Sequence, residues 1–223
     1  GVITLLFATL MWRKLPNTQP QSDLNIVSIY QSLFQIARNN PHLIRRACAG
    51  ALGFGILSMV FTSMTFALGS APYFFNDFEI GLFGLLGVIG IYSSSWSGKT
   101  VGLGKENLVA KLCISLMLFS CVPLFFAQQN IGIYAIGVLM SYFGLTAFHV
   151  LNQNLVYRID ANARSRINAV YMTIYFSGAA LGSLGAVYAW EHWQWQGCVA
   201  LGLTFAIGIL WIDRFDFKLM RKN

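Results

Sequence analysis

Long apolar runs with almost no formal charge set the strongest limit on what this chain can fold into. A short apolar start at 1–12 is followed by six longer runs, at 47–68, 80–96, 108–127, 131–151, 169–190 and 197–212. A helix needs about 20 apolar residues to cross a bilayer, where every backbone amide must be satisfied within the segment. With 56% hydrophobic and only 10% charged residues, the chain falls outside the composition of soluble domains, which are about 25% charged. We expect an all-α polytopic membrane protein.

The apolar start at 1–12 lacks the basic beginning and small-residue cleavage site of a signal peptide. It ends at Trp12-Arg13-Lys14, as the end of a spanning helix does. We therefore expect a fragment whose upstream part is missing. The expected organisation is the end of a transmembrane helix at 1–12, a cytoplasmic linker at 13–46, a six-helix bundle at 47–212 and a cytoplasmic tail at 213–223.

Basic residues fall on one side of the expected topology. All fifteen lie in the linker, between the run at 80–96 and the first turn of the run at 108–127, after the run at 131–151, or in the tail, whereas the opposite loops hold only acidic charges, Asp77, Glu79 and Glu191. The positive-inside rule places the basic side and the C-terminus in the cytoplasm. The net charge of +7 thus reflects topology and attraction to lipid headgroups, and it requires no nucleic acid. Trp190, Trp193 and Trp195 are expected to form an aromatic belt at the outer edge.

The linker contains one candidate helix. The prolines at 16 and 20 exclude a helix over 15–20, and Ser22 or Asp23 can cap the segment that follows. From 24 to 37, apolar residues recur at steps of three and four, which predicts an amphipathic helix lying on the cytoplasmic face of the bilayer and ending at Asn39-Asn40-Pro41. A partner-binding helix is the alternative.

Glycines recur at helix-packing spacing in two of the runs. The first set is Gly81, Gly84, Gly87 and Gly90, and the second is Gly178, Gly182 and Gly185. Glycine stripes let two helix backbones approach closely. Static packing and a sliding contact against a partner bundle are equally compatible with this pattern.

Polar side chains gather on one face of the run at 131–151 and its extension. Tyr142, Thr146, His149 and Gln153 follow steps of four, three and four, and such a face avoids lipid because unsatisfied polar groups are costly there. A histidine hydrogen-bonded between helices and a contact lining a water-filled pathway are both open. Together with Thr62 and Phe66, these residues form the predicted substrate cavity. The four cysteines lack metal-ligand spacing, and we expect neither a metal nor a cofactor.

The run from Arg164 to Ser183 resembles the tenth-to-eleventh helix region of the major facilitator superfamily, in its twelve-helix efflux branch. His149, Asn152 and Gln153 are similar to an element late in the tenth helix of many members, and Leu15-Pro16-Asn17-Thr18 to one that follows the sixth. The resemblance implies a C-terminal half, completed by an N-terminal bundle of the same full-length chain in a bacterial inner membrane. It also implies secondary transport of a small solute by alternating access, with proton-coupled export, and not an enzyme.

One departure concerns the cytoplasmic loop signature of that family. Gly98 and the basic Lys99 remain, but Gly102 and Leu103 stand where the family has Asp and Arg, so the charge relay of this loop is not carried over. The expected spans contain no Asp or Glu. We therefore expect the missing half to carry most of the protons, with His149 as the candidate here.

Two other classes fit the same sequence. A non-transporting membrane scaffold or sensor could use this fold, since fold does not fix function. An intramembrane serine protease would need a membrane serine near a histidine, and Ser95 or Ser97 with His149 fits that requirement only superficially.

Overall fold

The structure is a computed structural model that describes residues 2–14, 26–128 and 130–220, and it divides into two units, 1–32 and 33–223. The first unit contains helix α1 (Val2–Lys14) and the start of α2 (Ile26–Asn39). Apolar side chains of α1 such as Phe7 and Trp12 are exposed. The assignment of α1 as the end of a spanning helix stays a prediction, and the loop at 15–20 and the Ser22 or Asp23 cap lie outside the described residues.

The second unit begins within α2. This helix ends at Asn39, and Pro41 opens the next one, as the sequence predicted. Leu33, Ile36 and Ala37 pack against the core of the unit, whereas Phe34 is exposed. The apolar side of this part of α2 therefore packs on the bundle, and Phe34 lies on the outer side of the helix.

The remaining helices form a bundle of crossings. They are α3 (Pro41–Gly69), α4 (Asp77–Leu82) continuing through the 3₁₀ segment η1 (Phe83–Val88) into α5 (Ile89–Thr100), α6 (Glu106–Phe119) with α7 (Cys121–Phe125), α8 (Ile131–Tyr157) and α9 (Arg164–Met220). Within the described ranges, five helical stretches are long and apolar enough to cross a membrane, and no strand occurs. This confirms an all-α polytopic membrane protein.

Helix α9 reverses direction at Gln194, whose φ of 53° and ψ of −149° are not helical. The Cys198 Sγ atom lies 3.5 Å from the Ala186 carbonyl oxygen, and Gly185 faces Leu201. The helix is thus a hairpin with a first limb at 164–193 and a second limb at 195–220, and each limb is long enough for one crossing. The sequence predicted a loop at 191–196, but in the structure Gln194 is the single non-helical residue of that stretch.

Two helices extend beyond their expected bounds. Helix α3 begins at Pro41 rather than at 47, and α9 continues to Met220 through most of the segment expected as a tail. Both extensions bring charged residues into helices that pack on one another, because α3 and α9 are neighbours along their length.

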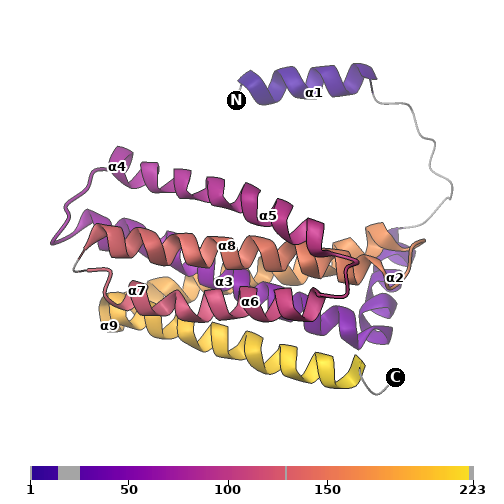
Figure 1. Ribbon diagram of the computed structural model, residues 1–223. Coiled ribbons are helices and arrows are strands. Elements are labelled where there is room, and N and C mark those ends of the chain that lie inside the picture. Colours follow the sequence, from indigo (N-terminus) through magenta and orange to yellow (C-terminus); the bar gives the residue numbers. More distant parts are fainter. Residues whose placement is uncertain (1, 15–25, 129, 221–223) are drawn as a thin grey trace. The chain divides into compact units, whose positions relative to one another are not determined.

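The connections lie at two ends of the bundle (Figure 1). The start of α3, the α5–α6 and α8–α9 connections and the end of α9 share one end, which we call the basic end. Its basic residues are Arg45, Arg46, Lys99, Lys105, Arg158, Arg164, Arg166 and Arg214. The α3–α4 and α7–α8 connections and the reversal of α9 share the opposite end. The charge segregation seen in the sequence is therefore also a segregation in space.

The opposite end of the bundle is closed by Trp195. This side chain is only 1% exposed, and its Nε1 donates a hydrogen bond of 2.6 Å to the Leu124 carbonyl oxygen. The prediction that Trp195 belongs to an aromatic belt is wrong, because the single-residue reversal at Gln194 turns it inward. Trp193, on the other side of that residue, is exposed.

Candidate functional site

The polar face of α8 looks inward, toward three neighbouring helices. Tyr142, Thr146, His149 and Gln153 are all half-buried. The Tyr142 ring meets Phe61 of α3 edge-to-face, with ring centroids 6.0 Å apart. The Tyr142 side chain is therefore directed at protein within the bundle, as the cost of polar groups in lipid requires.

Helix α5 covers the part of this face that holds Thr146 and Tyr142. The Thr146 hydroxyl is hydrogen-bonded to the hydroxyl of Ser93, and it also donates to the Tyr142 carbonyl oxygen of its own helix at 2.7 Å. A Cβ atom at Gly87 or Gly90 would lie 3.0 Å from the Tyr142 ring or hydroxyl. Gly87 of η1 and Gly90 of α5 therefore leave room for the Tyr142 side chain of α8.

His149 faces the first limb of α9. Its Nδ1 atom lies 3.3 Å from the hydroxyl of Tyr171, and its ring lies over Tyr175 with centroids 4.4 Å apart. The expectation of a histidine hydrogen-bonded between helices describes this arrangement. A role of the same side chain in a transport pathway is a separate statement and stays a prediction.

The remaining predicted cavity residues lie elsewhere. Thr62 on α3 shares a hydrogen bond of 2.5 Å with Ser183 on α9. Phe66, which is 41% exposed, has its ring 5.6 Å from that of Trp190. Thr62 and Phe66 therefore belong to the interface between α3 and the first limb of α9, and the structure does not join them to the polar face of α8.

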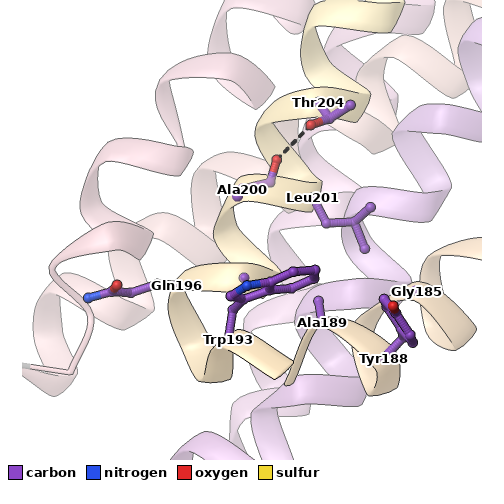
Figure 2. A pocket seen from close by; sticks show the side chains of 9 residues that line it. Gly185, Tyr188, Ala189, Trp193, Gln196, Ala200, Leu201 and Thr204 are labelled. Atoms are coloured by element: carbon purple, nitrogen blue, oxygen red, sulfur yellow. Dashed lines mark hydrogen bonds between the residues drawn. The ribbon is translucent and has the colours of Figure 1, made fainter. Parts of the chain in front are cut away.

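A cavity of about 570 Å³ lies between the two limbs of α9, near their reversal (Figure 2). Tyr188 and Trp193 come from the first limb, and Gln196, Leu201 and Thr204 from the second. None of the six predicted cavity residues lines it. The lining is mainly apolar, with the Thr204 hydroxyl already donating to the Ala200 carbonyl oxygen at 2.9 Å.

The second glycine stripe packs within this chain. Ideal Cβ atoms at Gly178 and Gly182 would lie 2.1 Å and 2.2 Å from the carbonyl oxygens of Ala51 and Gly55 on α3. Gly185 instead accommodates Leu201 of the second limb. Gly178 and Gly182 thus lie where the first limb of α9 approaches the backbone of α3, and a contact of this stripe with a separate bundle stays a prediction.

The first stripe is divided. Gly87 and Gly90 face Tyr142, whereas Cβ atoms at Gly81 and Gly84 would meet nothing within 4 Å. Large apolar residues on the same segment are exposed, including Phe78, Leu82, Leu85, Val88 and Ile91. The outward side of 77–91 is therefore free to contact lipid or another bundle.

The degenerate loop signature lies at the end of α5, and its glycine is not covered by other side chains. Gly98 and Lys99 are exposed residues of the last turn of α5. Gly102, with a φ of 87°, donates its backbone N–H to Glu106 Oε1 at 2.8 Å, and Arg158 Nη1 lies 3.3 Å from the same oxygen. The positive φ at Gly102 suits glycine, and the resulting turn ties the α5–α6 connection to the end of α8.

A buried ion cluster that the sequence pattern did not predict lies at the basic end. Arg46 on α3 is 2% exposed, and Asp213 and Asp216 on α9 are 5% and 1% exposed. Asn152 on α8 adds its side chain, with Oδ1 3.4 Å from Arg46 Nη1. The helix bounds hid this cluster, since Arg46 was assigned to the linker and both aspartates to the tail. Their i, i+3 spacing on a continuing helix was the available signal.

These features define the class of the protein: an all-α polytopic membrane protein whose polar side chains lie between helices. The chain is similar to bacterial proteins that are named transporters. It is 35% identical over 207 residues to the uncharacterized transporter YgaY of Escherichia coli O157:H7, with 93% of this chain and 52% of the relative covered. It is 30% identical over 177 residues to the probable transporter SCO4007 of Streptomyces coelicolor, with 78% and 40% covered.

A third relative carries a family name. The chain is 21% identical over 218 residues to the uncharacterized MFS-type transporter YybF of Bacillus subtilis, with 96% of this chain and 53% of the relative covered. The chain spans about half the length of the curated relatives that it matches. No protein-family model and no solved structure matches it.

Proposed function

We propose that this chain is the C-terminal half of a major facilitator transporter that moves a small solute by alternating access and exports it in exchange for protons. The observation that carries the proposal is the similarity to proteins named transporters, which extends over 93% of this chain but about half of the first relative. The matched half of the relative corresponds to the one bundle of six crossings in this chain. The other half would be an N-terminal bundle of the same full-length chain.

The arrangement of the helices supports an interface with that second bundle. The segment 77–91 exposes apolar side chains and two glycines with open space beside them, Gly81 and Gly84. Open glycines permit close approach of another helix backbone. In this proposal the N-terminal bundle packs against that surface, and the solute site lies between the bundles near the membrane midplane, as in transporters built from repeats.

The solute contacts proposed on this half lie on α8 and α3. Tyr142, Thr146, His149 and Gln153 are half-buried on one face of α8, and small displacements of α5 or α9 would expose them. Thr62 and Phe66 would contribute from the α3–α9 interface. The set carries hydroxyl, amide, imidazole and aromatic groups but no carboxylate, which favours neutral or amphipathic solutes.

The proposed orientation follows from the basic end. Lys99 lies there in the last turn of α5, Lys105 and Arg158 in connections, and Arg214 near the end of α9. Positively charged loops remain on the cytoplasmic side during insertion. The proposal therefore places the basic end and the C-terminus in the cytoplasm, with the protein in the bacterial inner membrane.

Flux through the full-length protein tests the proposal. The complete protein is reconstituted in liposomes, and neutral and amphipathic solutes are screened with and without an imposed pH gradient. We expect solute flux that rises with the gradient. Equal flux in both conditions contradicts proton coupling, and absence of flux from folded protein favours the scaffold or sensor alternative.

Replacement of His149 tests the predicted site. In the full-length protein, His149→Ala should reduce flux without loss of folded protein, whereas His192→Ala, at an exposed position near the reversal of α9, should leave flux unchanged. Unchanged flux and pH response in His149→Ala would remove this residue from the site. The protease alternative receives no support, since Ser97 donates to the Ala147 carbonyl oxygen and His149 pairs with Tyr171.

A further inference from the structure

The two carboxylates of the buried ion cluster have unequal partners. Asp216 has three close nitrogen neighbours, two of them on arginines: Arg45 Nε lies 2.9 Å and His42 Nδ1 2.8 Å from its Oδ1, and Arg46 Nε lies 2.7 Å from its Oδ2. Such charge-assisted contacts hold a carboxylate in its ionised form. Asp216 is therefore the fixed anion of the cluster.

Asp213 is held much less closely. Its Oδ1 lies 3.5 Å from Arg46 Nη1, and that same nitrogen lies 3.4 Å from the Asn152 oxygen. Two other charges act on it electrostatically, an attractive one on Lys111 of α6 and a repulsive one on Asp216. A carboxylate that is 95% buried with one long, shared contact lacks the close pairing that usually accompanies a buried charge.

The ion cluster that contains Asp213 has a partly exposed rim on one side and reaches the polar face of α8 on the other. His42 and Arg45, at the rim of the cluster, have side chains that are 25% and 28% exposed. Inward, Asn152 bonds both Arg46 and the hydroxyl of Tyr171. Tyr171 in turn contacts His149 at 3.3 Å, so a continuous series of polar groups runs from the basic end to the predicted site.

We propose that Asp213 is a proton-binding site of this half, and that its protonation releases the contact between the basic ends of α3 and α9. A hydronium ion at the basic end donates the proton: one of its O–H bonds breaks, an O–H bond forms on the Asp213 carboxylate, and a water molecule is left. Asp216 stays ionised and keeps Arg45 and Arg46 paired. This replaces the expectation that the half holds no buried carboxylate able to carry a proton.

Release of the α3–α9 contact follows from charge balance. Ionised Asp213 and Asp216 together balance Arg45 and Arg46, and a neutral Asp213 leaves one positive charge in excess beside Lys111. The second limb of α9 then loses part of its attraction to α3. Proton binding by Asp213 does not depend on the proposed transport, although its use in coupling does.

Infrared difference spectroscopy of the purified full-length protein tests this proposal. The carbonyl stretch of a protonated carboxyl group is followed during acidification, in wild type and in Asp213→Asn and Asp160→Asn, the latter an exposed acid in the α8–α9 connection. We expect a band that appears at a pH where surface aspartates are still ionised, persists in Asp160→Asn and is lost in Asp213→Asn. A band that survives in Asp213→Asn, or no such band in wild type, overturns the proposal.

A second measurement separates this proposal from the transport proposal. Asp213→Asn mimics the protonated state without titrating, and it keeps the close contacts of Asp216, so the variant should fold. A spin-label distance between the basic ends of α3 and α9 should lengthen with acidification in wild type and be pH-independent in Asp213→Asn. Both readouts require no solute flux, and an invariant wild-type distance would overturn the release of the contact.

Discussion

The Nε atom of Arg46 on α3 lies 2.7 Å from Oδ2 of Asp216 on α9, so a buried ion pair joins the first and last crossings of the bundle. Removal of one partner from a buried pair leaves an uncompensated charge and typically costs about 3–5 kcal/mol. We expect Arg46→Ala to lower the free energy of unfolding by that amount, measured by denaturation in mixed micelles. Arg45→Ala, at the more exposed rim, should cost about 1 kcal/mol or less. Equal losses would contradict this assignment.

Gly182→Ala should destabilise the protein, because a Cβ atom there would lie 2.2 Å from the Gly55 carbonyl oxygen of α3. Backbone cannot move away as a flexible side chain can, and overpacking costs about 1–3 kcal/mol or more. The matched control is Gly98→Ala in the last turn of α5, which meets nothing within 4 Å and is exposed. Alanine at that position should be neutral or stabilising, by up to about 1 kcal/mol in unfolding measurements. If the control variant is destabilised and Gly182→Ala is not, the close contact between Gly182 of α9 and Gly55 of α3 is contradicted.

The hydrogen bond between Thr146 and Ser93 should be measurable as a coupling energy between α8 and α5. Interhelical hydrogen bonds in membrane proteins average about 0.6 kcal/mol in double-mutant cycles. We expect this value from Thr146→Val combined with Ser93→Ala in unfolding experiments. The pair Thr204→Val and Ser93→Ala serves as the control, since Thr204 bonds the Ala200 carbonyl of its own helix. Its coupling should be zero within error.

Trp195→Phe should lower the thermal stability of the protein because it removes the donor to the Leu124 carbonyl oxygen. A buried acceptor left without its partner costs about 1–3 kcal/mol. Trp193→Phe, at the exposed position beside the same reversal, should have little effect. If Trp193→Phe proves the more damaging variant, the expected aromatic belt describes this end better than an inward-facing Trp195 does.

The sequence was sufficient to predict the crossings and one helix end. Apolar runs are read directly from composition, and Pro41 removes the N–H that would continue α2, so both features depend on local information. The polar face of α8 was likewise predictable, because spacing of four, three and four residues places Tyr142, Thr146 and His149 on one side of any helix.

The partners of those faces were not predictable. Gly178 and Gly182 predict the close approach of another helix but not which helix it is. In the structure that helix is α3, which is far away in the sequence. Arg46, Asp213 and Asp216 were assigned to flanking polar segments because charge usually marks the limit of a crossing. Their burial results from the juxtaposition of two helix ends, which depends on tertiary packing.

The turn at Gln194 has a mechanical consequence. With a single non-helical residue and the Cys198–Ala186 contact close beside it, the two limbs of α9 have no slack where they meet and cannot part there without unwinding. Relative movement between them is therefore greatest at their far tips. Relative movement of the two limbs therefore pivots at Gln194. Asp213 lies on the second limb far from this pivot, so a change in its attraction to α3 acts where the limb can move most.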